Sequence, residues 1–405
     1  MKTKTNLLVA GIFVTVFAIC FEAPTSNADP LDTWHWRDAP PSLKDLYGVI
    51  YNGGKFVAVG DAGTIVVSAE GTKWTLSDSG SSARLRGVAY GGGMFLAVGA
   101  GGTLLSSPDA VNWTARDSGT TNDLDAVTYG QNLFVAVGAN GTITTSRDGV
   151  VFVAKEGAVR DRLNLTSVVY LSGIVYGQGI FLGSLNGSWI FGSDNGGVDW
   201  WVGETTLLEH RSDILLKHVA YGNGRFVIVG EGFFNPDPIA LPVILTSTNT
   251  IDWDQVADFD LLAGSLHAIA FGRGTFVSAG EVCFGCLEAV LLSSTDGTNW
   301  TFRHARASRN LYGIAFGGGT FVAVGESGAI LQSDKIGPRL ELLSATQPFA
   351  FNVIADPGEN GRVEASTDLV TWTTLTNFAS ATGTNQFTDL AAPNFERRFY
   401  RAVTP

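Results

Sequence analysis

The stretch LYGVIYNGGKFVAVGDAG, residues 46–63, returns almost unchanged as LYGIAFGGGTFVAVGESG at residues 311–328. The underlying pattern, L-x-[small]-[VI]-x-[YF]-x-x-G-x-F-x-x-x-G, also recurs between these two copies, with one position relaxed in each of the third, fourth and fifth copies. It starts at Leu46, Leu85, Leu124, Leu171, Leu216, Leu266 and Leu311. The tenth residue after each leucine is a phenylalanine: Phe56, Phe95, Phe134, Phe181, Phe226, Phe276 and Phe321. A period of about 40 residues is typical of repeat architectures.

Each copy has the pattern of four short strands separated by glycine-rich turns. In the first copy these strands are LYGVIY, KFVAVG, GTIVVS and KWTLS. A four-stranded sheet of this composition is apolar on both faces and needs a neighbour on each side. Radial stacking of such sheets buries both faces and leaves short edges. The sequence therefore predicts an all-β fold, a seven-bladed β-propeller.

The two ends of the repeat region complement each other. The seventh copy stops at AILQSD, residues 329–334, without a fourth strand. Near the N-terminus, DTWHWRDAPPSLKDLYG (32–48) aligns with GTKWTLSDSGSSARLRG (71–87), which places Trp34 or Trp36 where Trp74 lies. We therefore expect an N-terminal strand to complete the seventh sheet and to close the ring.

The first 28 residues have the pattern of a cleaved secretory signal. Lys2 and Lys4 precede an apolar run from Leu7 to Phe21, and the small residues Ser26 and Ala28 follow. This apolar run is short for a membrane span. The prediction is a secreted, periplasmic or cell-surface protein that has no membrane insertion after cleavage.

The C-terminal part reads as a separate module. The runs FAFNVIA, GRVEAST and TWTTLTNF alternate with Gly, Pro and Asn turns, a pattern that favours a small β-sandwich. The predicted organisation is a signal peptide at 1–28, the propeller at 29–335, a linker at 336–340 and the C-terminal β-sandwich at 341–405.

Composition restricts the function. The net charge is −12 and the chain has 50 glycines and 16% charged residues. An acidic protein lacks the basic face that nucleic-acid binding requires. The five histidines form no apparent metal site, and no cofactor is predicted. In an oxidising compartment Cys283 and Cys286 are predicted to form a disulfide, with a redox CxxC pair or half of a zinc site as alternatives.

The turns before the fourth strands carry a family resemblance. SSPDAVNW (106–113), TSRDGVVF (145–152), GSDNGGVDW (192–200) and SSTDGTNW (293–300) resemble the Asp-box turns of sialidase-like, BNR-repeat propellers. The whole repeat, over residues 32–334, is similar to exported propellers related to photosystem II stability and assembly factors. Most turns are one residue shorter than the usual Asp box, and Glu70, Thr248 or Asn249 replaces the acid in some copies. The resemblance implies a structural turn, in which Ser and Asp bind turn amides and the aromatic residue packs between blades.

Two further resemblances bear on function. VEASTDLVTW with RRFYRAV resembles fibronectin type III-like C-terminal modules. Sialidase activity would need an arginine cluster and a tyrosine nucleophile paired with glutamate. Arginines occur near the blade ends, but the F/Y-R-I-P signature is absent, and Tyr47 and Tyr312 have no evident glutamate partner in the sequence. No catalytic residue is assigned. A photosystem assembly role is a further possibility that the resemblance allows.

Two sets of residues are candidate binding groups. Acids open the turn after the second strand in four consecutive copies, at Glu231, Glu281, Glu326 and Asp61, with Phe233, Phe234 and Phe284 nearby. Copies five and six also carry insertions there, at 231–243 and 281–290. We hypothesise that this acidic arc binds a polyol, a cation or a basic partner segment. The alternative is a set of solvated carboxylates in an acidic protein.

The second set is the residue directly after each repeat leucine. These residues lie near the start of each innermost strand and are candidates for a ring around the channel mouth, the alternative being ordinary solvated side chains: Tyr47, Arg86, Asp125, Ser172, Lys217, His267 and Tyr312. The function predicted from the sequence is an exported, non-catalytic binding or scaffold module for a protein or surface glycan. The alternative is a carbohydrate-active enzyme, sialidase-like or another glycosidase.

Overall fold

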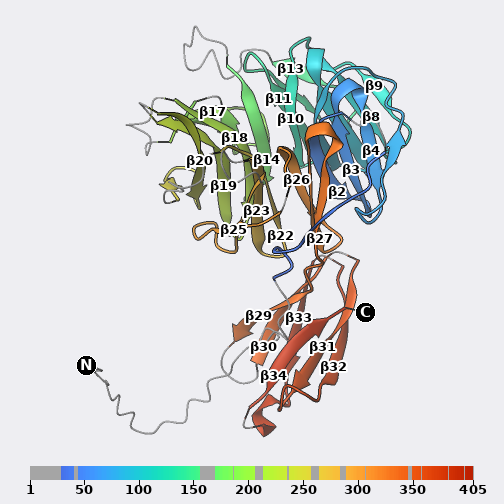
Figure 1. Ribbon diagram of the computed structural model, residues 1–405, viewed down its shortest axis with the longest axis vertical. Helices are drawn as coiled ribbons and strands as arrows, with labels where there is room; N and C mark the ends of the chain where they lie inside the picture. Colours follow the sequence, from blue (N-terminus) through green and yellow to red (C-terminus); the bar gives the residue numbers. More distant parts are fainter. Residues whose placement is uncertain are drawn as a thin grey trace, which may run out of the picture. The chain divides into compact units, whose positions relative to one another are not determined.

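The computed structural model describes most of the chain (Figure 1). The described residues are 29–40, 44–155, 169–185, 187–205, 213–234, 237–256, 264–282, 289–305, 307–344, 349–356, 358–381, 383–395 and 397–404. The predicted signal peptide, the Cys283–Cys286 pair and Phe284 lie outside them. The described residues divide into two compact units, with the boundary between Lys335 and Ile336. No helix among them has the length and apolar character of a membrane span.

In its described residues the first unit is built from four-stranded antiparallel sheets, numbered here in chain order. Sheet 1 holds β2 (Leu46–Asn52), β3 (Lys55–Gly60), β4 (Ile65–Ser68) and β5 (Thr75–Ser77). Sheet 2 holds β6 (Leu85–Gly91), β7 (Met94–Gly99), β8 (Leu104–Ser107) and β9 (Thr114–Arg116). Sheet 3 holds β10 (Leu124–Gly130), β11 (Leu133–Gly138), β12 (Ile143–Ser146) and β13 (Val153–Lys155). Sheet 4 holds β14 (Leu171–Gly177), β15 (Ile180–Leu185), β16 (Trp189–Ser193) and β17 (Trp201–Glu204).

The remaining sheets follow the same order. Sheet 5 holds β18 (Asp213–Gly222), β19 (Arg225–Phe234), β20 (Asp237–Ser247) and β21 (Asp254–Gln255). Sheet 6 holds β22 (Leu266–Gly272), β23 (Thr275–Val282), β24 (Ala289–Ser294) and β25 (Thr301–Arg303). Sheet 7 holds β26 (Leu311–Gly317), β27 (Thr320–Gly325), β28 (Ile330–Ser333) and the N-terminal β1 (Trp34–Trp36).

Strand β1 pairs antiparallel with β28, so Trp34 lies opposite Ser333. The Trp34 indole is buried and its Nε1 donates to the Leu31 carbonyl oxygen at 2.9 Å. Trp74 of sheet 1 makes the same bond to Gly71, also at 2.9 Å. Trp36 is 46% exposed. Trp34 is therefore the counterpart of Trp74, which decides between the two tryptophans that the sequence alignment left open.

Neighbouring sheets share apolar cores. The first strand of each sheet contacts the first strand of the next, and β26 of sheet 7 contacts β2 of sheet 1. The core between these last two includes Leu46, Val66, Val322 and Ile330. The repeat phenylalanines are all at most 2% exposed. Burial of each such side chain stabilises the fold by about 1.5–3 kcal/mol, which explains their fixed spacing.

At the end of a first strand, the aromatic ring of the next sheet packs directly on a glycine. A Cβ added to Gly272 would lie 1.9 Å from Cγ of Phe316, and one added to Gly317 would lie 1.9 Å from Cγ of Tyr51. Such distances leave no room for a side chain. The Tyr-Gly and Phe-Gly pairs of the repeat thus hold adjacent sheets together.

The turns before the fourth strands are cross-linked by their own side chains. In sheet 2, Oδ1 of Asp109 accepts from the amides of Val111 and Asn112, at 2.9 and 2.8 Å. Trp113 Nε1 donates to the Ala110 carbonyl at 3.1 Å. These bonds hold the pKa of Asp109 well below its usual range, with the Asn112 amide as the largest cause. The hydrogen bonds expected for this turn are present.

The second unit has two three-stranded sheets in its described residues. One holds β29 (Arg339–Ser344), β30 (Phe349–Ile354) and β33 (Thr384–Asp389), and the other holds β32 (Thr373–Ala379), β31 (Asn360–Ser366) and β34 (Phe399–Val403). Their shared core includes Phe351, Val363 and Tyr400.

The turn between β31 and β32 repeats the geometry of the turns in the first unit. Asp368 Oδ1 accepts from the amides of Val370 and Thr371, at 2.9 and 2.7 Å, and Trp372 Nε1 donates to Leu369 at 3.2 Å. The sequence reading did not identify STDLVTW as this turn. Because the same turn forms in two different kinds of sheet, it is a local motif that does not depend on the sheet around it.

The insertion in sheet 5 differs from the loop that the sequence suggested. Strands β18, β19 and β20 are lengthened, so that Leu215 pairs with Glu231 and Phe233 pairs with Asp213 and Ala240. The described part of the insertion is therefore an extension of the sheet.

Candidate binding mouth

Every first strand contains a β-bulge at the residue after the repeat leucine. The pairing of β2 with β3 shifts between Leu46 and Gly48, so that Tyr47 has no partner on β3. The other six sheets shift at the same place. The bulged residues are Tyr47, Arg86, Asp125, Ser172, Lys217, His267 and Tyr312. A bulge re-aims one side chain without disturbing the strand beyond it.

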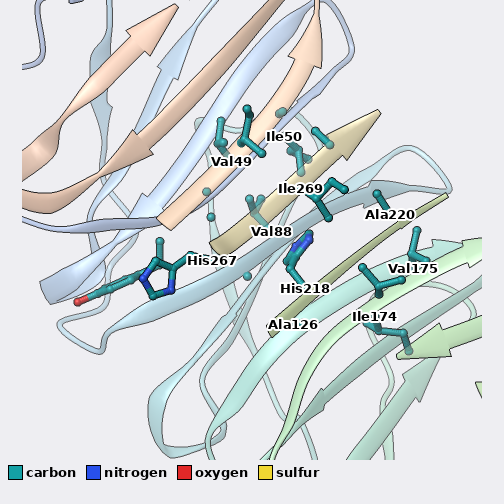
Figure 2. Close-up of a pocket in the computed structure, with 18 of the residues that line it drawn as sticks. Val49, Ile50, Val88, Ala126, Ile174, Val175, His218, Ala220, His267 and Ile269 are labelled. Atoms are coloured by element: carbon teal, nitrogen blue, oxygen red, sulfur yellow. The ribbon is translucent and has the colours of Figure 1, made fainter. Parts of the chain in front are cut away.

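All seven bulged residues line the same cavity, of about 800 Å³. We call them the mouth residues. Figure 2 shows part of the cavity wall, including His218, His267 and Ile269. The volume is within the range of small-molecule binding pockets. The bulges thus bring together residues that lie far apart in the chain.

Below the mouth the wall is apolar. The second residue after each mouth residue is Val or Ile, and all seven line the cavity: Val49, Val88, Val127, Ile174, Val219, Ile269 and Ile314. We call this ring the bore. Its chemistry follows from the repeat pattern, which requires Val or Ile at this position.

One sector of the mouth is a hydrogen-bonded chain of charged groups. Lys217 Nζ lies 3.1 Å from Glu231 Oε2, 2.7 Å from Ser265 Oγ and 3.4 Å from His267 Nδ1. His267 Nε2 lies 3.1 Å from Glu281 Oε1. An ammonium group only donates hydrogen bonds, so Nδ1 of His267 accepts one from Lys217. Nε2 of His267 therefore carries the ring proton and donates a hydrogen bond to Glu281. The hydrogen bond from His267 lowers the pKa of Glu281.

The next sector is aromatic. The His267 and Tyr312 rings meet edge to face at 5.3 Å, and Tyr312 stacks on Tyr47 at 5.5 Å. The Arg84 guanidinium lies 5.2 Å from the centre of the Tyr47 ring. The Tyr47 hydroxyl donates to Asp61 Oδ2 at 3.2 Å, while Arg84 Nε binds Oδ1 at 2.5 Å. Burial, and then the charge of Asp61, raises the pKa of Tyr47 to about 12.

The third sector is an arginine between two acids. Arg86 Nη1 lies 2.8 Å from Asp123 and 2.9 Å from Asp125. Burial raises the pKa of Asp125, and the positive charge of Arg86 acts in the opposite direction. Asp123 also accepts from the Gly101 amide at 2.7 Å, the largest cause of its lowered pKa. Arg86 is therefore held in place by carboxylates.

Three of the four acids of the predicted arc bind mouth residues. Asp61 binds Tyr47 and Arg84, Glu231 binds Lys217, and Glu281 binds His267. Glu326 accepts from the Asn310 amide at 3.3 Å. Each acid has an internal partner, an arrangement that positions the mouth side chains. Direct ligand binding by the arc stays a prediction. Phe233 and Phe234 lie on β19, and their side chains are not described.

His218 is a residue that the sequence reading missed. It directly follows a mouth residue, where the other six copies have Gly48, Gly87, Ala126, Gly173, Ala268 and Gly313. These positions are small because a Cβ on Gly48 would lie 2.7 Å from the Arg86 carbonyl oxygen. His218 lines the cavity, and its Nδ1 is sealed from solvent without a hydrogen-bond partner in the described structure. Burial lowers its pKa to about 4, while a hydrogen bond with the Ile269 backbone acts in the opposite direction.

One contact of the site was not recognised from the sequence. Tyr47 binds Asp61, which is 14 residues away in the chain and meets it through the bulge.

Within the described residues no group of three or more His, Cys, Asp or Glu could hold a metal ion.

No protein-family model matches the chain, and no curated protein sequence matches it. Solved structures do resemble it. YCF48 from Cyanidioschyzon merolae is 17% identical with a TM-score of 0.55, over 74% of this chain and 98% of that one. YCF48 bound to D1 peptide is 16% identical with a TM-score of 0.56, over 77% and 99%. A catalytically inactive virginiamycin B lyase from Staphylococcus aureus with quinupristin is 16% identical with a TM-score of 0.58, over 75% and 99%. Together with the four-stranded antiparallel sheets, these similarities show an all-β fold of the β-propeller class.

Proposed function

We propose that the first unit is a seven-bladed β-propeller, closed by its N-terminal strand, that binds a segment of a partner protein at the mouth. The observation that carries this proposal is the convergence of seven bulged side chains of different chemistry on one open cavity. Bulges are costly irregularities that proteins commonly place next to functional sites. Seven of them aimed at one cavity favour binding over a purely structural role.

The mouth is suited to a peptide because its polar groups are already held in place. Lys217, His267 and Arg86 are oriented by carboxylates, and Tyr47 by Asp61. Pre-organised donors and acceptors lose little side-chain entropy when a ligand binds. A peptide backbone offers the matching carbonyl and amide groups.

The similarity to YCF48 supports the same proposal. One of the similar structures is YCF48 bound to D1 peptide, so this fold accommodates a peptide ligand in at least that protein. The identity of 16% transfers no ligand to this chain. We therefore propose the class of partner, a protein segment, without naming it.

The carbohydrate-active alternative has less support from the geometry. A tyrosine beside a carboxylate is the arrangement of a base-activated nucleophile. Tyr47, however, has its pKa raised to about 12, so its hydroxyl stays protonated near neutral pH. Both ring nitrogens of His267 are engaged with Lys217 and Glu281. These arrangements position side chains for binding more readily than for proton transfer.

We also propose export, with cleavage before Asp29, and kinship to Asp-box propellers. The support is the signal pattern in the sequence, together with the Ser-x-Asp turn geometry at Asp109 and Asp296. The fibronectin type III-like nature of the second unit is proposed from its two packed three-stranded sheets. Mass spectrometry of the mature N-terminus tests the export proposal, because a retained Met1 contradicts it.

The binding proposal is tested with a displayed library of random peptides selected against residues 29–405. We expect selected peptides to lose affinity about tenfold or more for the double variant Arg86→Ser with Lys217→Ser. Lys155→Ser, an exposed position on β13, is the matched control and is expected to bind normally. If no peptide is selected, or if the mouth variant binds as well as the control, the proposal fails. Binding of a soluble glycan that depends on the same residues would support the glycan alternative instead.

A further inference from the structure

The cavity has two tiers of opposite chemistry. The mouth tier carries hydroxyl, guanidinium, carboxylate, ammonium and imidazole groups. The bore tier consists of seven Val or Ile side chains. A ligand that fills both tiers must be polar where it meets the mouth and apolar where it enters the bore.

The bore is a poor place for water. A buried water needs two to four polar partners. Val and Ile side chains offer none, and the Nδ1 atom of His218, which also lines the cavity, is a single partner. The residues that follow the bore tier add further apolar wall, including Ile50, Val175, Ala270 and Phe271. Displacing poorly bound water from such a preformed cavity by an apolar group is favourable.

The strands that form the bore wall are closely packed. The small residues between the tiers let adjacent first strands approach closely, as a Cβ on Gly313 would lie 2.7 Å from the Tyr47 carbonyl oxygen. Six of the seven bore residues are buried, from 2% exposed for Val219 and Ile269 to 7% for Val49, and Val127 is partly buried. The cavity is present in the structure without a bound ligand.

From this two-tier structure we infer that the bore takes an apolar side chain, aliphatic or phenyl, of the peptide whose backbone lies on the mouth. This inference rests on the proposed function and names the class of partner: a protein segment with an apolar anchor residue flanked by polar backbone contacts. The mouth residues bind the peptide backbone, and the bore determines which anchor side chain the peptide must have.

The direct test uses methyl NMR of residues 29–405 with labelled isoleucine. The probes are N-acetyl-leucinamide and, as a polar control, N-acetyl-serinamide at equal concentration. We expect leucinamide to shift the methyl signals of Ile174, Ile269 and Ile314 and to leave those of Ile65 and Ile330, which are fully buried between sheets, unchanged. Equal shifts with both probes, or none in the bore, would overturn the inference.

A second arm separates this inference from the proposed function. In a peptide selected at the mouth, replacing its apolar anchor by serine should weaken binding about ten- to hundredfold, since burying such a side chain contributes about 1.5–3 kcal/mol. Ala270→Leu, which fills the bore, should weaken the same peptide. Peptides that bind the mouth without shifting the bore methyls would refute the anchor while leaving the proposed function intact. Leucinamide in the bore with no selectable peptide would refute the proposed function while leaving the bore as a site for an apolar group.

Discussion

At the scale of the residue, an aromatic side chain of one sheet packs on a glycine at the end of the first strand of the preceding sheet. Gly272 is required because the Phe316 ring lies over its Cα, and Gly317 is required by Tyr51 in the same way. The repeat pattern leaves these two positions unspecified, so the sequence analysis assigned no role to these glycines. Their packing role depends on a ring from the neighbouring sheet, which one strand's sequence does not reveal.

The substitution Gly272→Ala tests this contact. We expect a loss of about 3 kcal/mol in the free energy of unfolding, because the new Cβ would overlap Phe316. Chemical denaturation measures it, and Gly337→Ala, which has no atom within 4 Å of its Cβ, is the control. Adding Phe316→Ala should recover part of the loss. A stability equal to that of the Gly337→Ala control would show that the ring does not constrain this glycine.

His218 makes stability depend on pH. Its folded-state pKa of about 4 lies below the unfolded value of about 6.5, so the unfolded chain binds more protons between these pH values. The free energy of unfolding should therefore fall by about 2–3 kcal/mol as the pH drops from about 6.5 to about 4. The variant His218→Ala, which matches Ala126 and Ala268, should reduce this slope, whereas His35→Ala should retain it. An unchanged slope in His218→Ala would contradict the assignment.

At the scale of the element, the repeated bulge decides where function lies. Successive side chains of a regular strand alternate between its two faces, and a bulge interrupts this alternation by one residue. The bulge lets Leu311 stay buried while Tyr312 lines the mouth. The sequence predicted which seven residues to examine, from their shared position. It could not predict the bulge, because bulges depend on pairing with the second strand.

Deleting Tyr312 tests the bulge against the side chain. Without the extra residue, the side chain of Leu311, which is fully buried, would point to the opposite face of the strand. We therefore expect the free energy of unfolding to fall by about 3 kcal/mol. Tyr312→Ser, which installs the residue found at Ser172, should cost about 1 kcal/mol or less. Both are measured by chemical denaturation. Equal effects of deletion and substitution would mean that the bulge contributes nothing to the placement of Leu311.

At the scale of the whole molecule, the repeat allowed the sheets, their strand order and the pairing of β1 with β28 to be anticipated. The candidate site was less predictable. The acids of the arc were recognised as a set, but their partners, such as Lys217 for Glu231 and Arg84 for Asp61, come from elsewhere in the fold. Lys217 and Glu231 meet across paired strands of one sheet, whereas Arg84 and Asp61 meet where two sheets adjoin. Neither arrangement is contained in the pattern of a single strand.

The N-terminal strand is expected to stabilise the first unit as a whole. Trp34 is buried, so Trp34→Ala should lower the free energy of unfolding by about 3 kcal/mol. Trp36, two residues further on, is 46% exposed, and Trp36→Ala should cost less than about 1 kcal/mol. Denaturant titration of both variants provides the comparison. Similar losses in the two variants would argue against closure by this strand.

The most direct test of the central claim is a crystal structure of residues 29–405 with a peptide selected from the displayed library. The account predicts that the peptide backbone lies across the mouth, in contact with Arg86, Lys217 or Tyr312, and that one apolar side chain enters the bore beside Ile269. A peptide bound along an outer strand edge or at the Ser-x-Asp turns, with an empty mouth, would contradict it.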